Sequence, residues 1–183
     1  AQTFPVYFII IAMGVGLSIG TTSLIANSLG EGEKKKASYF LAQSIILAII
    51  TAIIVSILGI YLGPSIILFM NDSYLIMNLS MEYLNIIFLG SIFIFVQMAV
   101  NSSLSAMGDT KTNRNVLIVS FFLNIILNPL FIFGYGIIPA MGMKGIGIST
   151  IISQGLGTTY ILYKATLTDL SEYLYLNCFK PKI

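Results

Sequence analysis

Two asparagines four residues apart, Asn124 and Asn128, are the side chains whose type and spacing most clearly indicate binding chemistry. In a helix they lie on one face, with Ser120 one turn earlier on the same face. Pro129 has no N–H, so the carbonyl of Ile125 loses its usual helical partner. Two amide oxygens and a freed carbonyl at similar depth suit a small hard cation or a substrate that donates hydrogen bonds. The alternative is that the two amides hydrogen-bond neighbouring helices, a contribution of about 1 kcal/mol or less.

Two further polar rows repeat at the spacing of one helical turn. Gln97 and Asn101 form the first row, and Thr150 and Gln154 belong to the second. An uncharged polar group in hydrocarbon costs free energy unless it finds a partner, so such side chains are expected to face a bundle interior or a wet cavity. Both rows therefore remain open to two interpretations, the lining of a cavity or hydrogen bonding between helices.

Long apolar helices must position these polar rows, because the charged residues divide the chain into uncharged stretches. The stretches are residues 1–30, 37–71, 83–108, 115–143 and 145–163. A helix needs roughly 20 mostly apolar residues to cross a hydrocarbon core of about 30 Å. The sequence therefore predicts five transmembrane helices at about 5–29, 37–61, 83–107, 115–137 and 144–163. Residues 64–81, interrupted by Asn71-Asp72, are predicted to form an interfacial stretch that leads into the third helix.

The composition excludes most soluble classes of protein. Of 183 residues, 57% are hydrophobic and only 9% are charged, too few to cover a globular surface with water-compatible side chains. Disorder needs low hydrophobicity, and a net charge of +2 is too small to indicate a nucleic-acid partner. The absence of histidine and the single cysteine, Cys178, exclude histidine-based catalysis, histidine-rich metal sites and a disulfide within the chain.

The basic residues predict the orientation of the helices in the membrane. Five antiparallel helices place loops 30–36 and 108–114 and the C-terminus on one side. That side receives eight of the nine basic residues, namely Lys34, Lys35, Lys36, Lys111, Arg114, Lys164, Lys180 and Lys182, and the other side receives Lys144. Because cytoplasmic loops carry the excess of Lys and Arg, we expect the first side to be cytoplasmic, in a multi-pass protein of the plasma (inner) membrane.

Several segments, taken in order, resemble the multidrug and toxic compound extrusion (MATE) family. Residues 30–34, followed by Lys36-Ala37, are similar to the first cytoplasmic loop of that family, and residues 82–84 to a helix start. Residues 107–112 (MGDTKT) are similar to its G-D-T-K/R-T-P loop, with Asn113 where proline is usual. Residues 124–134 (NIILNPLFIFG) and 139–154 (PAMGMKGIGISTIISQ) are similar to two further family segments.

The resemblance implies an architecture of twelve helices in two six-helix lobes that open alternately to each side of the membrane. Residues 1–163 would then be helices two to six of the N-terminal lobe, and residues 164–183 the cytoplasmic linker between the lobes. We accordingly expect an all-α integral membrane fragment with the first helix and the second lobe missing. These missing parts, the lipid bilayer and small organic substrates are its expected partners, with no nucleic acid.

The resemblance also implies a cation site. Some family members use an acid from the first helix, an Asn and an Asp from the fifth and a Thr from the sixth. The matching positions are Asn124, Asn128 and Thr150, so Asn128 stands where the family has its Asp. Na⁺ coordination by these neutral oxygens is the expectation, weakened by the lost charge. Gln97, Asn101 and Gln154 are the candidate cavity lining, and no cofactor beyond the coupling ion, Na⁺ or H⁺, is expected.

The function implied is a secondary active antiporter that exports organic, above all cationic, compounds in exchange for Na⁺ or H⁺ by alternating access. One alternative is a related flippase of lipid-linked precursors, which would be expected to carry Arg or Lys in its cavity. Another is a non-transporting membrane fragment. An intramembrane enzyme is disfavoured, because the predicted spans contain neither His nor Asp.

Overall fold

Five long helices and one short 3₁₀ helix make up the computed structural model, which describes residues 3–136 and 138–173. Residues 174–183, with Cys178, Lys180 and Lys182, lie outside the described residues, so the predictions that rest on them stay open. The elements are α1 (Phe4–Gly30), α2 (Lys34–Met70), α3 (Tyr74–Ala106), α4 (Lys111–Phe133), α5 (Met143–Thr166) and η1 (Asp169–Tyr173). The expected all-α membrane architecture is confirmed.

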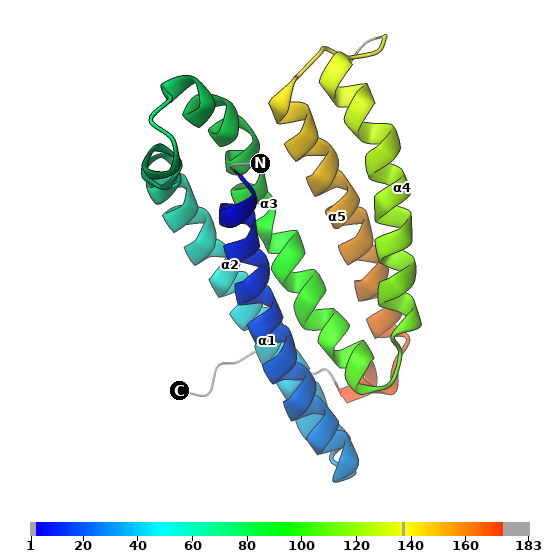
Figure 1. Cartoon of the computed structure of the whole chain (residues 1–183). Coiled ribbons are helices and arrows are strands. Elements are labelled where there is room, and N and C mark those ends of the chain that lie inside the picture. The colour runs from blue at the N-terminus through cyan, green and yellow to red at the C-terminus, as the bar shows by residue number, and fades with distance from the viewer. Residues whose placement is uncertain (1–2, 137, 174–183) are drawn as a thin grey trace.

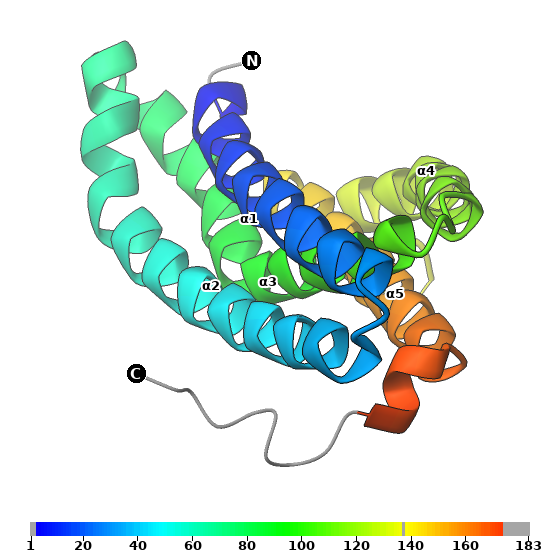
Figure 2. The same ribbon diagram turned by 90° about the horizontal axis from the view of Figure 1, so that it is seen from below.

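Helix α3 lies at the centre of the bundle. It packs against α1 and α2 on one side and against α5 on the other, while α4 packs on α5 (Figures 1 and 2). The chain thus brings α3 and α5, which are separated in sequence by α4, into direct contact. This arrangement leaves a space bounded by α1, α3, α4 and α5, which Gln97, Asn101 and Gln154 line together.

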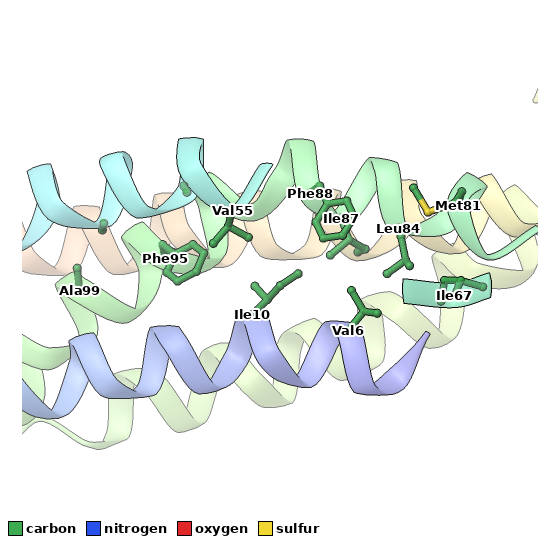
Figure 3. Packing of buried hydrophobic residues seen from close by; sticks show 12 residues of the cluster. Val6, Ile10, Val55, Ile67, Met81, Leu84, Ile87, Phe88, Phe95 and Ala99 are labelled. Atoms are coloured by element: carbon green, nitrogen blue, oxygen red, sulfur yellow. The ribbon is translucent and has the colours of Figure 1, made fainter. Parts of the chain in front are cut away.

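The main apolar core fills the junction of α1, α2 and α3 (Figure 3). Phe88 and Phe95 of α3 are its largest buried side chains, and Val6 and Ile10 of α1 point toward them. Helix α2 can lie this close because Gly59 faces the Phe88 ring, where a Cβ atom would be 2.3 Å from ring atom Cε1. A glycine is therefore required here for packing rather than for backbone conformation.

Four of the described helices, α1 to α4, are long and apolar enough to cross a membrane. Helix α4 is the most exposed, with only 6% of its most apolar window buried, so lipid or another helix must cover its apolar side chains. Helix α5 is less apolar because glycine, serine and threonine form its buried face. Small residues of this kind allow the close helix contacts that membrane proteins use, which explains how α5 packs between α3 and α4.

Residues 64–81 are helical except at 71–73, and their predicted interfacial location stays a prediction. Helix α2 continues through Pro64 to Met70, and α3 begins at Tyr74. The turn between them spans three residues, and Asn71 Oδ1 accepts a hydrogen bond of 2.9 Å from the Ser73 N–H. The sequence interpretation ended the second span at residue 61 and began a new segment at Pro64, whereas the helix continues to Met70 and ends at the polar pair.

The α4–α5 connection is a tight hairpin that ends α4 at Phe133, before the predicted boundary at 137. Gly134 has a φ of +75°, and a Cβ there would lie 2.7 Å from the Ile138 carbonyl oxygen. The Met141 N–H donates to the Phe131 carbonyl over 2.9 Å, so the hairpin satisfies one of the carbonyls left free at the helix end. Pro129 is accommodated inside α4 without ending it.

The segment after α5 folds back onto the ends of α1 and α2. Leu170 of η1 is 1% exposed and packs with Ile25, Ala37 and Leu41. Its carbonyl accepts a 3.0 Å hydrogen bond from the Ser38 hydroxyl. The first ten residues of the predicted linker 164–183 are therefore the last turn of α5 and a docked η1, and its role as a linker stays a prediction.

Candidate functional site

A groove of about 400 Å³ lies between α1, α3, α4 and α5 and is the strongest candidate for a functional site. We call it the polar groove. Three of the polar side chains singled out in the sequence, Gln97, Asn101 and Gln154, line it together. The rest of its lining is Tyr7, Ile11, Val15, Ser18 and Ile19 of α1, Ile94 and Met98 of α3, and Asn113 and Leu117 of α4.

Asn101 is the side chain in the groove whose hydrogen bonding is incomplete. Its Oδ1 atom is buried and has no hydrogen-bond partner among residues 3–136 and 138–173. An unsatisfied buried acceptor costs about 1–3 kcal/mol, so such an atom normally has a water or ligand donor. Asn101 lines the groove, so a small shift of its side chain would offer this buried oxygen to a donor group.

Gln97 is held by the neighbouring helix. Its Oε1 lies 3.3 Å from the hydroxyl of Thr158 on α5, and that hydroxyl also lies 2.9 Å from the Phe93 carbonyl oxygen. Gly157 makes room for this contact, because a Cβ there would lie 3.1 Å from Gln97 Oε1. Packing between α3 and α5 thus orients Gln97.

The α1 wall of the groove is tied to α3 by hydroxyl groups. Ser18 Oγ lies 2.8 Å from Ser102 Oγ, and Thr22 Oγ1, which donates to the Ser18 carbonyl of its own helix over 2.8 Å, lies 3.5 Å from the Ser102 carbonyl oxygen. These contacts fix a polar edge beside Asn101 without introducing a charge. The described lining contains no Asp, Glu, Lys or Arg, so the groove is polar and electrically neutral.

Asn124, Asn128 and Thr150 lie outside the groove lining, on α4 and α5, and we call the contact between these two helices the α4–α5 seam. Asn128 is eleven residues beyond Leu117, which is about 16 Å along α4. Its Oδ1 accepts a hydrogen bond from the Ser149 hydroxyl. Ser149, adjacent to Thr150, is thus the α5 partner of the predicted site.

The other two predicted cation ligands bond to their own helices. Asn124 Nδ2 donates to the Ser120 carbonyl over 2.9 Å, and Thr150 Oγ1 donates to the Ile146 carbonyl over 2.8 Å. Both side chains keep free acceptor capacity, since a carboxamide oxygen and a donating hydroxyl can still accept. The seam brings Asn128 and Thr150 onto facing helices, and cation binding there stays a prediction.

The sequence interpretation missed several polar groups that border these sites. Ser18 and Asn113 line the groove, and Ser149 bonds to Asn128. Asn113 is the position where the resembling family usually has proline, so its substitution was a visible signal. Single serines such as Ser18 and Ser149 gave no such signal, because a lone hydroxyl in an apolar helix normally hydrogen-bonds to the backbone of its own helix.

The charged loops gather at one end of the bundle, away from the Lys144 end of α5. Lys34 Nζ lies 2.8 Å from Asp169 Oδ2, and this ion pair lowers the pKa of the Asp169 carboxyl.

Asp109 accepts from both the hydroxyl (2.6 Å) and the backbone N–H (3.0 Å) of Thr112 at the start of α4. These two hydrogen bonds hold the pKa of Asp109 below its usual value. Asp109 therefore accepts hydrogen bonds from the first turn of α4, which is a structural role.

The described part of the chain contains no cluster of charged side chains that could bind a metal ion. Among residues 3–136 and 138–173, no group of three or more His, Cys, Asp or Glu side chains could hold a metal ion. A cation at the α4–α5 seam would instead depend on neutral oxygens.

Comparison with known proteins gives consistent relatives. The family model MatE matches residues 1–130. "Probable multidrug resistance protein NorM" of Thermotoga maritima is 32% identical over 162 residues, which cover 87% of this chain and 35% of that protein. An "FAD transporter" of Shewanella oneidensis is 30% identical over 153 residues, 82% of this chain and 33% of the relative. The chain therefore spans about a third of the length of the curated relatives it matches.

The fold agrees with the sequence comparison. A solved structure described as the inward-facing conformation of a multidrug resistance MATE family transporter matches with a TM-score of 0.88 at 27% identity. The match covers 99% of this chain and 40% of that one, as expected for part of one lobe. With the family model covering residues 1–130 and the bundle superposing along almost its whole length, the chain belongs to the MATE family of membrane transporters, which are not enzymes.

Proposed function

We propose that this chain is part of a secondary active antiporter that exports organic cations by alternating access. The observation that carries the proposal is the buried, unpartnered Oδ1 of Asn101 in a neutral polar groove. A protonated amine can donate a hydrogen bond to that oxygen, and its apolar part can pack on neighbours such as Ile94 and Met98.

The neutral lining gives no counter-charge to an ion of either sign, so the preference for a hydrogen-bond donor such as an ammonium rests on the unpartnered Asn101 Oδ1. A carboxylate or phosphate in the groove would find no Lys or Arg among the described lining residues, and its desolvation would be uncompensated. A substrate like that named for the FAD transporter, or a lipid-linked pyrophosphate carried by a flippase, therefore requires basic groups from outside this chain. The groove gives neither alternative specific support.

The coupling cation belongs, in this proposal, to the α4–α5 seam. Asn124, Asn128 and Thr150 would supply oxygen ligands for Na⁺, whereas H⁺ coupling would need a titratable group, which these three residues lack. Moving one Na⁺ down a membrane potential supplies about 2.3 kcal/mol per 100 mV. The exchange would be completed by parts of the protein outside this chain.

The proposed setting is the plasma membrane, with loops 30–36 and 108–114 and the C-terminus in the cytoplasm. The clustering of Lys34, Asp109 and Asp169 at one end of the bundle supports a common side for these loops. The excess of basic residues in them favours the cytoplasmic side.

The test is drug efflux by the full-length protein in inside-out vesicles, with Na⁺ and proton gradients applied separately. Asn101→Leu should raise the KM for a cationic substrate by roughly 5- to 150-fold, because a lost hydrogen bond to a charged donor costs about 1–3 kcal/mol. Asn27→Leu is the matched control, since Asn27 is exposed at the end of α1 and away from the groove. Efflux that responds to neither gradient, or an unchanged KM in Asn101→Leu, would refute the proposal.

A further inference from the structure

A second polar hollow, separate from the groove, lies between the first turns of α5 and the adjoining part of α3. We call it the α3–α5 hollow. Its volume is about 590 Å³, and it shares no lining residue with the polar groove. It is lined by Asn78, Met81, Glu82, Asn85 and Ile86 of α3 and by Lys144 of α5.

The hollow presents one negative and one positive group that are only loosely paired. Glu82 Oε1 and Lys144 Nζ lie 3.7 Å apart, beyond hydrogen-bond distance, and their side chains are 40% and 58% exposed. Each ion therefore keeps hydrogen-bonding capacity for a third group. An exposed pair of this kind adds little stability by itself.

Asn85 adds an acceptor that nothing in the described chain satisfies. It lies three residues after Glu82, so both side chains project from the same face of α3. Its Oδ1 is buried and has no hydrogen-bond partner among the described residues. Glu82 and Asn85 both line the hollow, so a donor group that enters it meets the carboxylate and reaches the buried carboxamide oxygen after a small shift of the Asn85 side chain.

The position of the hollow fits the boundary between the bilayer core and its headgroups. Lys144 is the second residue of α5, and Glu82 lies eight residues after the start of α3, about 12 Å along that helix. The surface of the neighbouring α3 turns is apolar, with Leu75, Leu79 and Leu89 exposed. A charged hollow near helix ends, beside exposed leucines, is suited to a molecule with a polar head and hydrocarbon chains.

We propose that the α3–α5 hollow binds the headgroup of an aminophospholipid, a lipid that carries both a primary ammonium and a phosphate. The ammonium donates to the Glu82 carboxylate and to Asn85 Oδ1, and the phosphate accepts from Lys144. The acyl chains run from the hollow past the exposed Leu89, toward the middle of α3 and away from its first turn. This assignment concerns a lipid that holds α3 and α5 together and does not depend on what the protein transports.

The charge pattern selects this class of ligand over simpler ones. A lone cation would be repelled by Lys144, and a lone anion by Glu82, whereas a zwitterion of matching polarity satisfies both. A trimethylated choline headgroup carries the same charges but has no N–H to give to Asn85 Oδ1. The hollow should therefore distinguish ethanolamine from choline lipids.

The experiment uses the full-length protein in nanodiscs that contain equal amounts of ethanolamine and choline phospholipids with identical chains. Lipids retained by the protein are counted by native mass spectrometry. The ethanolamine lipid should be retained about tenfold more than the choline lipid, which corresponds to about 1.4 kcal/mol. Retention should fall stepwise through the mono- and dimethylated headgroups as donors are removed. Equal retention of the two lipids by the unmodified protein would overturn the proposal.

Variants locate the preference in the hollow. Asn85→Leu and Glu82→Gln should each remove most of the tenfold preference, whereas Glu31→Gln, which alters an exposed ion pair on the α1–α2 loop, should leave it intact. Added soluble glycerophosphoethanolamine should not displace the lipid at concentrations comparable to the membrane lipid. A preference that persists in Asn85→Leu, or full displacement by the soluble headgroup, would contradict a lipid site at this position. The methylated lipids test the unmodified protein and give a result even if a variant does not fold.

Discussion

Replacing Leu170 by alanine should release η1 from the bundle without unfolding the helices. Burying one leucine side chain contributes about 1.5–3 kcal/mol, and Leu170 is 1% exposed against Ile25, Ala37 and Leu41. The hydrogen bond from the Ser38 hydroxyl adds about 1 kcal/mol, and the exposed Lys34–Asp169 pair adds less than that. The apolar contact is therefore the largest part of what holds η1 in place.

The truncation removes most of that contact, about 2–3 kcal/mol of local docking free energy. Because η1 is a single short turn at the edge of the bundle, the loss should appear as local opening rather than as a lower global stability. A change of this size corresponds to a roughly 30- to 150-fold shift in the opening equilibrium. Hydrogen exchange of the backbone amide of Ser171, which donates to the Thr168 carbonyl, should accelerate by that factor in the full-length protein.

Leu167→Ala is the matched control, because Leu167 precedes η1 but is 64% exposed. Exchange at η1 should change less than about twofold in that variant, as expected for a surface substitution. Equal acceleration in both variants would show that helix propensity, and not the buried contact, holds the turn. No acceleration in Leu170→Ala would show that the packing of Leu170 contributes nothing to docking.

Three further predictions concern packing, capping and the seam. Asp109→Ala should cost about 0.5–2 kcal/mol of unfolding free energy, because it removes the acceptor at the start of α4. Folding lowers the pKa of Asp109, so the stability that its carboxylate contributes is complete above the ordinary carboxyl pKa of about 4 and is lost as the pH falls through the lowered value. In a pH series of melting temperatures, the variant should lack this loss of stability at acidic pH. Gly59→Ala should cost about 1–3 kcal/mol by pressing on the Phe88 ring, and adding Phe88→Leu should recover part of the melting temperature; the absence of any recovery would argue against this contact. Asn128→Leu should raise the Na⁺ concentration for half-maximal efflux about tenfold while the control Asn27→Leu leaves it unchanged, and an unchanged Na⁺ response in Asn128→Leu would assign Asn128 to helix packing alone.

The sequence by itself determined the helices, because charges in lipid are costly and therefore mark where a span can end. Lys34, Lys111 and Lys144 lie within the first two residues of α2, α4 and α5. The interruption at Asn71-Asp72 was readable from the polar pair, whereas the turn at Gly134 was missed, because the predicted span ran through it to residue 137. Pro64 misled the interpretation, because a proline near a helix end can be accommodated without ending the helix.

The tertiary structure decided what each polar face meets. Helical spacing shows that Gln97 and Asn101 share a face, but only the packing of α1, α4 and α5 around α3 places Gln154 in the same groove. The same spacing rule put Asn124 and Asn128 on one face, yet the structure pairs Asn128 with Ser149 and turns Asn124 to its own backbone. Periodicity fixes the direction of a side chain relative to its helix, whereas its partner depends on how helices far apart in the chain pack together.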